Sequence, residues 1–503
     1  ECVDYLEVTG TRTTDMKMQI GQAFVTGDLF SLPAGTVQAV LGAEYRGFEY
    51  IFDPGTGAGP VSGFTSQDPE AGNNSFRDFF GELLVPLVRD VPFAQSIDLS
   101  LGYRRSSSEF ANELTGFESS GEVSHAYKAE IDWRVMDPLR IRASYQRAVR
   151  APNFNELFAG GGSSPQYFDP CSVGTAARTG ANGAQVTALC ATAGAFGGVG
   201  DTATFVQTPG NQLAIVLAGN EDLEPEIGTT LTLGAVWSSP WESQWLQRLR
   251  GSIDYYNIKV EDAILGRSPN QIVASCYNYY GTNPTYDPNN PNCQAIVRLG
   301  GDILVLYNPD DPVNGEFDTS NGGEIETSGV DFQVDYGFDM EWLGLPNWGS
   351  MRLNAVVTYL IEYIEQLPVL GAPPIDVAGA ANYAGGGDGR FSTSFPRWRA
   401  NLNARWDLGN VNLNTRIRYL AGMDNRLNRE FPGETEFTGP DSVVYVDAVA
   451  GYKLSQSVEL RLGVNNLFDK QPPEYNPNVQ SGTDPSLYDV IGRRVIMGVN
   501  LRF

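Results

Sequence analysis

The chain ends at residues 490–503 with the sequence VIGRRVIMGVNLRF. From Val495 onward, apolar side chains recur at every second position and end on the terminal aromatic residue, Phe503. The positions between them are polar or small, with Ile496 as the one apolar exception. Period-two alternation predicts a β-strand with one apolar and one polar face. The last element is therefore predicted to be a strand that lies between an apolar and a polar environment.

The same alternation recurs upstream, over runs long enough to matter for fold class. The clearest examples cover residues 97–104, 128–135, 139–146, 399–406 and 411–419. A soluble β-sandwich would show this pattern in shorter strands, with its charged face towards water. Runs of about ten residues, with arginines and acids on the polar face, suit tilted strands whose apolar face contacts lipid.

The connections between these strands alternate in length. Short turns are expected at residues 31–35, 90–95, 136–138, 408–409 and 454–457. Long irregular segments are expected at roughly 53–74, 110–121, 151–224, 263–323, 366–390, 422–439 and 469–489. Short turns at one end and long loops at the other are typical of an antiparallel transmembrane β-barrel of the bacterial outer membrane, with its long loops outside the cell.

Composition agrees with this fold class. No window of 18 apolar residues occurs among the 503, so no transmembrane helix is predicted. The formal charge of −26 argues against a nucleic-acid partner. Two explanations of the acidity stay open: a solvated surface, or long acidic loops that face cations, glycans or peptides.

The cysteines form two local pairs inside polar, loop-like segments. Cys171 and Cys190 are 19 residues apart, and Cys276 and Cys293 are 17 apart. No histidine lies beside them and no C-x-x-C occurs, which disfavours a zinc site. Two loop disulfides are therefore expected, in an oxidising compartment outside the cytoplasm. Cys2 is left without a partner in this pattern.

Strand counting gives about fifteen strands, opening with one near residues 17–29. Bacterial outer-membrane barrels have an even number of strands. Residues 1–503 are therefore expected to be the C-terminal part of a larger barrel.

Several motifs resemble conserved segments of TonB-dependent receptors. The segment YQRAVRAPNFNELF at residues 145–158 is similar to their Arg-Ala-Pro-Asn turn and the Glu-Leu-Phe that follows it. Residues 223–226 (LEPE), 463–470 (GVNNLFDK) and the hairpin at residues 32–46 resemble further family segments. The matching positions are Arg150, Ala151, Pro152, Asn153, Glu156, Leu157, Phe158, Asn466, Leu467, Phe468 and the terminal Phe503. We interpret these positions as mostly architectural, such as strand-end turns, rather than as ligand contacts.

The resemblance implies a 22-stranded barrel preceded by a plug domain. Neither the plug nor about seven first strands are found in this chain. The chain would then begin within an extracellular loop, as one of two pieces of the receptor. The N-terminal portion is an expected partner, held through a disulfide to Cys2.

The function that the resemblance implies is active import of a scarce nutrient across the outer membrane. The inner-membrane TonB complex would pull on the plug, and the barrel would be embedded in outer-membrane lipid. No cofactor and no enzyme activity are expected, because the chain has no Gly-rich phosphate loop and only one histidine, His125. His125 is interpreted as a surface or rim residue.

An oligosaccharide or a peptide is the expected substrate. Aromatic rings stack on sugar faces, and Asn and Asp side chains accept hydrogen bonds from hydroxyl groups. The long loops supply aromatic candidates: Tyr167, Phe168, Tyr277, Tyr279, Tyr280 and Tyr286. The same rings could instead pack the loops on themselves.

Other interpretations stay open. A ferric-siderophore or cobalamin receptor is the first alternative, and a passive porin-like channel is the second. The acidic loop at residues 307–324 could bind calcium through oxygen ligands or could simply be solvated. It carries Asp310, Asp311, Asn314, Glu316 and Asp318.

Overall fold

The fold was described from a computed structural model of the chain. The structure describes residues 11–55, 68–119, 121–159, 162–165, 169–192, 198–206, 214–266, 269–279, 281–299, 302–306, 317–366, 374–382, 394–426, 438–475 and 482–502.

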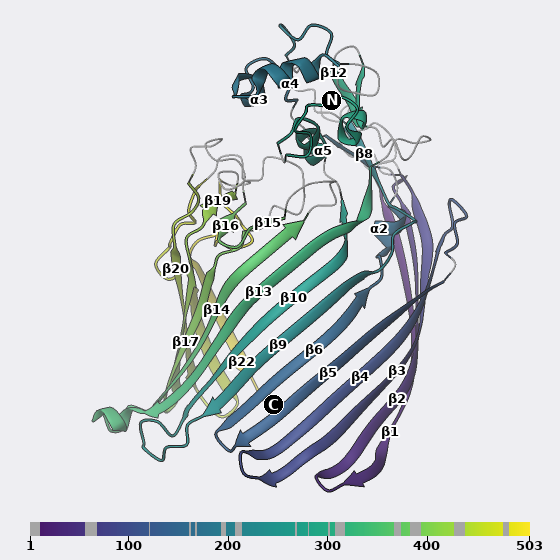
Figure 1. Ribbon diagram of the computed structural model, residues 1–503. Coiled ribbons are helices and arrows are strands. Elements are labelled where there is room, and N and C mark those ends of the chain that lie inside the picture. Colours follow the sequence, from purple (N-terminus) through teal and green to yellow (C-terminus); the bar gives the residue numbers. More distant parts are fainter. Residues whose placement is uncertain are drawn as a thin grey trace.

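Fifteen long strands, paired antiparallel in chain order, form one strongly curved sheet (Figure 1). They are β1 (Thr13–Leu32), β2 (Gly35–Asp53), β3 (Glu70–Val91), β4 (Ala94–Asn112), β5 (Glu122–Met136), β6 (Leu139–Arg150), β9 (Glu226–Ser238), β10 (Leu249–Gly266), β13 (Phe317–Asp339), β14 (Ser350–Gln366), β17 (Trp398–Leu408), β18 (Val411–Leu420), β20 (Val443–Lys453), β21 (Val458–Asn465) and β22 (Arg494–Leu501). The two-residue β15 (Ile375–Asp376) adds to β14 as a sixteenth member. The all-β antiparallel fold is thus confirmed.

The sheet has one apolar and one polar face, as its alternating sequence predicts. Leu41, Phe79 and Ile131 lie on the apolar face and are all exposed. We call this the outer face, because exposed apolar side chains on every second position suit contact with lipid. The opposite face carries cross-strand ion pairs such as Arg142 with Asp254, and we call it the lumen face.

Aromatic side chains gather near both ends of the outer face. Towards the short turns, Trp133 donates its indole N–H to the Phe93 carbonyl and Trp406 donates to that of Trp348. Towards the long loops, the aromatic side chains are exposed tyrosines such as Tyr103 and Tyr127. Such aromatic girdles mark the two membrane interfaces of a barrel.

Among the described residues, β1 pairs only with β2, and β22 pairs only with β21. These two strands are therefore the edges of the sheet. Nearly every residue of β1 is exposed, including Met16, Met18 and Phe24 on its lumen-facing side.

Short helices and strands fill the long connections, which the sequence had led us to expect as irregular. This prediction was wrong because short elements in loops leave too few residues to show a period. The helices of the long connections are α2 (Phe154–Phe158), α3 (Ala176–Thr179), α4 (Gly183–Cys190), α5 (Pro269–Cys276) and α6 (Pro291–Gln294). The 3-10 helix η2 (Met340–Leu343) lies at the opposite end of the sheet, in the turn between β13 and β14. The short strands are β7 (Gly162–Pro165), β8 (Ala214–Ala218), β11 (Ile296–Leu299), β12 (Asp302–Leu306), β16 (Ala380–Ala381) and β19 (Asp424–Asn425). No helix in the described ranges is long and apolar enough to cross a membrane.

Candidate functional site

Two loops that are distant in sequence fold together above the long-loop end of the sheet (Figure 1). The first contributes residues 169–206 and the second residues 269–299; we call their described parts the cap. Their buried side chains form one shared hydrophobic core: Cys171, Val186, Leu189, Cys190, Val199, Ile272, Val273, Cys276, Tyr277, Cys293, Ala295 and Ile296. The cap is therefore a small packed unit rather than two separate loops.

Both disulfides predicted from the spacing are present, and both lie in the cap core. Cys171 is bonded to Cys190, and Cys276 is bonded to Cys293. All four cysteines are fully buried. Polar side chains also stabilise the second loop, since Asn283 donates to the Cys276 carbonyl at 2.8 Å and accepts from the Asp287 amide at 2.8 Å. The sequence indicated each disulfide but not that both would lie in one hydrophobic core.

The loop tyrosines named as candidate substrate contacts take up mostly internal positions. Tyr277 is only 2% exposed, so its ring is unavailable for stacking on a sugar. Tyr279 and Tyr286 are half-buried against the same core. Tyr167, Phe168 and Tyr280 lie outside the described residues, as do Cys2, Phe503 and residues 307–316 of the candidate calcium loop.

The motif at residues 150–158 builds the rim between β6 and α2. Asn153 caps α2 by accepting from the Glu156 amide at 2.9 Å, while the Glu156 carboxylate accepts from the Asn153 amide at 2.8 Å. Arg150 pairs with Glu156 at 2.8 Å and with Glu226 on β9 at 2.6 Å. Glu226 also accepts from the Ile264 amide at 3.1 Å. These contacts fasten three strands to the helix, which supports the architectural interpretation of the motif.

The apolar residues of that motif are buried because they pack in a hydrophobic cluster. Leu157 and Phe158 pack with Phe110, Leu223 and Ile264 in a second core cluster, beneath the cap. This cluster places the LEPE segment against the 150–158 segment, two motifs that the sequence showed only as separate.

A network of four charges lies on the lumen face across β2, β3 and β4. Asp78 is 1% exposed and accepts from both Arg104 and Arg46. Glu44 accepts from Arg104 and contacts Arg46, each at 2.8 Å. Beside it, a hollow of about 440 Å³ is lined by Phe80, Arg104, Lys128 and other lumen-facing side chains. The alternation predicted that these residues face the lumen but could not indicate which of them would form ion pairs.

Among the lumen-face arginines, Arg399 and Arg416 have no carboxylate within ion-pair distance in the described part of the chain. Arg399 on β17 donates to the Ser394 carbonyl at 3.5 Å, and Arg416 on β18 donates to the Asn401 side chain at 3.2 Å. Neighbouring Arg418, by contrast, is paired with Asp447 at 3.1 Å. Both guanidinium groups therefore have N–H donors available for an anion in the lumen.

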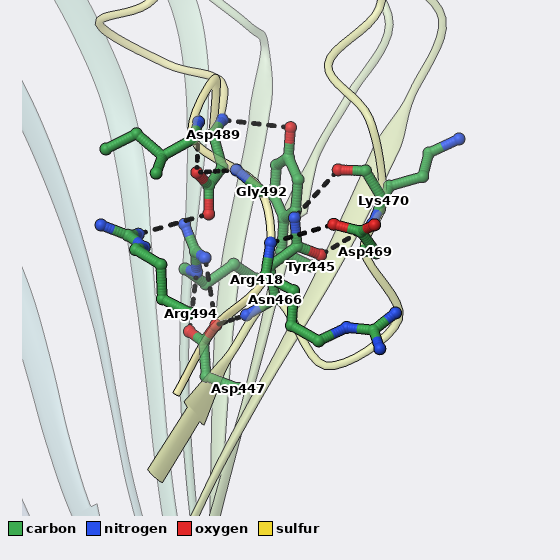
Figure 2. A network of polar contacts seen from close by, with 11 residues as sticks. Arg418, Tyr445, Asp447, Asn466, Asp469, Lys470, Asp489, Gly492 and Arg494 are labelled. Atoms are coloured by element: carbon green, nitrogen blue, oxygen red, sulfur yellow. Dashed lines mark hydrogen bonds and ion pairs between the residues drawn. The ribbon is translucent and has the colours of Figure 1, made fainter. Parts of the chain in front are cut away.

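The C-terminal motif joins the last strands through one polar network (Figure 2). Asp447 on β20 accepts from the Asn466 amide at 2.8 Å, in addition to its pair with Arg418. The Asn466 side chain makes two hydrogen bonds to the backbone of Lys470. It accepts from the Lys470 amide at 2.8 Å and donates to the Lys470 carbonyl at 3.0 Å. Asp469 in turn accepts from the Arg493 amide at 2.9 Å, at the start of β22. Asn466 thus ends β21 and orients the return to the last strand, while Leu467 and Phe468 stay partly or largely exposed.

A third buried cluster lies behind this network. Tyr445, Tyr475 and Tyr488 pack there with Ala381, Met423 and Val443. Burial raises the pKa of Tyr475 and of Tyr488 above the usual value for a phenol. Both loop tyrosines are therefore held neutral inside the protein.

This geometry is that of a membrane barrel with a polar lumen and a structured outer end. A family model described as TonB dependent receptor-like, beta-barrel matches residues 4–467. The chain belongs to the TonB-dependent receptor β-barrel family. It is accordingly an outer-membrane protein, and the resemblance seen in its motifs is confirmed. The family consists of transport receptors rather than enzymes.

Solved structures share this fold at low sequence identity. One is a mutant ferric enterobactin receptor (PfeA) of Pseudomonas aeruginosa in complex with enterobactin, with 14% identity and a TM-score of 0.56 over 97% of this chain and 54% of the receptor. Another is the Serratia marcescens hemophore receptor HasR in complex with its hemophore and heme, with 16% identity and a TM-score of 0.53 over 98% of this chain and 60% of the receptor. A third is the ferric-catecholate import receptor Fiu of E. coli K12, with 12% identity and a TM-score of 0.52 over 98% of this chain and 55% of Fiu.

The chain thus spans between half and two thirds of the length of these receptors. At such identities the likeness shows the fold alone. No protein of curated function is similar enough in sequence to match.

Proposed function

We propose that this chain forms most of the barrel of an active importer that takes up a scarce nutrient with energy delivered by the TonB complex. The observation that carries the proposal is the combination of family membership with a charged lumen face beneath a folded cap. A cap above a lumen offers a place to capture a ligand before it passes inward.

The open edges of the sheet support a larger assembly. β1 and β22 each have one unpaired edge in the described part of the chain, and unpaired edges in lipid are costly. Outer-membrane transporters with a plugged lumen have about 22 strands. We infer that about seven further strands and a plug from an N-terminal portion of the receptor close the barrel, and that TonB acts through this plug. A Cys2 disulfide to that portion would release an N-terminal fragment on reducing gels; one unchanged band with and without reductant would refute the disulfide.

For the substrate, charge favours a neutral or cationic ligand, and an oligosaccharide or a peptide is the class we propose. The chain carries a net charge of −26. At the rim, Arg150 is already neutralised by Glu156 and Glu226, so it does not offer a free cation to an anionic ligand. In the second cap loop, Asp287 and Asn289 are exposed and can bind hydroxyl or amide groups, whereas Asn283 is buried within the loop.

An anionic ferric chelate is the second candidate. Arg399 and Arg416 on the lumen face, without carboxylate partners in the described residues, are the observation that favours it. Guanidinium groups bind carboxylates and catecholates well because they present several donors in a fixed plane.

Uptake by living cells separates these possibilities. Cells with the intact receptor should accumulate labelled oligosaccharide or peptide, and an uncoupler that collapses the proton gradient should abolish that accumulation. Uptake that persists with the uncoupler would indicate a passive channel instead. Receptor abundance gives an independent readout: induction by the glycan or peptide supports the first class, whereas induction by iron limitation alone supports a ferric chelate.

A further inference from the structure

The outer face carries a cluster of basic and phenolic side chains just above its apolar band, on β4, β5 and β6. Arg105 lies directly across from His125, and Tyr127 lies across from Arg147. Tyr103 is the fifth member and lies opposite Tyr127. We call Tyr103, Arg105, His125, Tyr127 and Arg147 the basic patch. It lies on strands in the middle of the sheet, away from the open edges.

The height of the patch follows from the residues around it. Along β4, Leu99 and Leu101 precede Tyr103 and Arg105 on the outer face as the strand rises from the short turns. Along β5, Ala129 and Ile131 lie on the short-turn side of Tyr127. The patch therefore lies where the apolar band ends towards the long loops, at the level of the outer-leaflet headgroups.

Its internal contacts position the polar groups. The His125 Nδ1 atom is 2.7 Å from the Tyr103 hydroxyl, and the two rings are stacked with centroids 5.9 Å apart. Arg147 donates to the His125 carbonyl. The Arg147 guanidinium is thus held beside the imidazole and keeps further N–H donors free to point outwards.

What distinguishes the patch is the absence of acid. Other basic side chains at this level of the outer face are neutralised: Lys17 by Glu49 at 2.7 Å and Arg77 by Glu109 at 2.9 Å. On β10, Lys259 contacts both Glu261 and Glu324 at 3.2 Å. Arg105 and Arg147 have no carboxylate within ion-pair distance in the described residues, and Arg105 is exposed. On a chain with a net charge of −26, this is a local surplus of positive charge.

We propose that the basic patch binds the phosphate group of a glycolipid in the outer leaflet of the outer membrane. The charges are complementary, because two unpaired guanidinium groups face a layer that carries phosphates. The phenol of Tyr127 adds a donor at the same depth, and the apolar band below lies against the acyl chains of the same lipid. A soluble anion would contact the basic patch alone, whereas a lipid contacts both the patch and the apolar band, so we take a lipid as the occupant.

The test uses the purified full-length receptor in nanodiscs and lipid A as the probe, either phosphorylated or enzymatically dephosphorylated. Native mass spectrometry counts bound lipid for the wild type and for an Arg105→Gln/Arg147→Gln variant. Glutamine at 147 can still donate to the His125 carbonyl, so the local structure is kept. Each basic residue near an anionic surface contributes roughly a fivefold change in affinity. The variant should therefore lose about 25-fold in its preference for phosphorylated over dephosphorylated lipid A.

A Lys17→Gln/Arg77→Gln variant is the matched control, because it removes the same net charge from ion-paired positions at the same level. It should keep the preference within about twofold. An Arg105→Lys/Arg147→Lys variant should keep most of it, since the charge remains. Equal binding of the two lipids by the wild type, or an equal loss in the control, would overturn the proposal.

Discussion

The sulfur atom of Cys171 lies 2.9 Å from the phenol oxygen of Tyr277, although the two residues are 106 positions apart. A disulfide sulfur has no hydrogen, so the Tyr277 hydroxyl donates across the boundary between the two cap loops. The contact joins one disulfide loop to the helix end that carries the other disulfide, because Tyr277 directly follows Cys276. The two loops should therefore open together rather than separately.

Replacing Tyr277 tests this cooperation with a matched pair. Tyr277→Phe removes only the hydroxyl and should cost about 1 kcal/mol. Tyr277→Ala also empties a fully packed position and should cost about 3–5 kcal/mol. Protease cleavage within the distant 171–190 loop should speed up slightly for the first variant and strongly for the second. Cleavage there at the wild-type rate in Tyr277→Ala would show that the loops fold independently.

Removing one disulfide is a second test of the cap. A Cys276→Ser/Cys293→Ser variant should destabilise the cap by about 3 kcal/mol. Without the disulfide, the unfolded loop regains the conformational entropy that the cross-link removes. The intact 171–190 loop should then become protease-sensitive as well. Val173→Ala, at an exposed position of that loop, serves as the control and should change nothing. Protection of the first loop in the absence of the second disulfide would contradict a shared core.

At the rim, the ion pair of Arg150 and Glu226 should by itself contribute little to the free energy of unfolding. Arg150 is 44% exposed in its side chain, and pairs of this exposure are screened by water. A double-mutant cycle of Arg150→Ala and Glu226→Ala should give a coupling of about 1 kcal/mol, measured from thermal unfolding of the receptor in detergent. Glu226→Ala alone should cost more than Arg150→Ala, because it also removes the hydrogen bond from the Ile264 amide to the Glu226 carboxylate. The reverse order would show that the contact with Ile264 is unimportant.

The buried Tyr488 should make the fold sensitive to alkaline pH. Its pKa is raised chiefly by burial, so the folded protein keeps the phenol proton where the unfolded chain, near pH 10, releases it. This group contributes its full stability below pH 10 and progressively less above it, by about 1.4 kcal/mol per pH unit while the folded form stays protonated.

Tyr488→Phe should therefore reduce the loss of stability between pH 9 and 11. The substitution should cost little at neutral pH, since the Tyr488 hydroxyl is buried without a hydrogen-bond partner in the described residues. The folded fraction, followed by the heat-dependent mobility shift on gels, measures the effect, and Tyr452→Phe at an exposed position is the control. An alkaline profile identical to that of the wild type would refute the assignment.

The sequence was a good guide wherever one periodic rule governs the structure. The strand predicted from the alternation at residues 411–419 is β18 (Val411–Leu420), and the count of about fifteen strands matches the long strands observed. Alternation also placed Arg416 and Arg418 on the same polar face. It could not show that Arg418 has Asp447 as a partner whereas Arg416 has only Asn401, because cross-strand neighbours depend on register.

The candidate site was harder to predict for a related reason. Cysteine spacing was enough to indicate two disulfides, since each closes a short local loop. Packing of those loops against each other depends on side chains such as Val186 and Ile272, which belong to helices too short to show a helical period. The sequence consequently left Tyr277 open as either a ligand contact or a packing residue, and the structure places it in the cap core.

Asn466 offers the sharpest test of the C-terminal network, because it is fully buried and adopts a left-handed backbone with φ of 49°. Asn466→Ala should cost about 3–4 kcal/mol: two hydrogen bonds to Lys470 are lost, and alanine disfavours that conformation. Asn466→Gly tolerates the conformation and should cost about 1 kcal/mol less. Asn466→Asp keeps the acceptor for the Lys470 amide and should cost least. The temperature at which the folded gel mobility is lost should rank the variants as Ala, Gly, Asp and wild type in increasing order, and equal values for all four would mean that Asn466 only marks the end of β21.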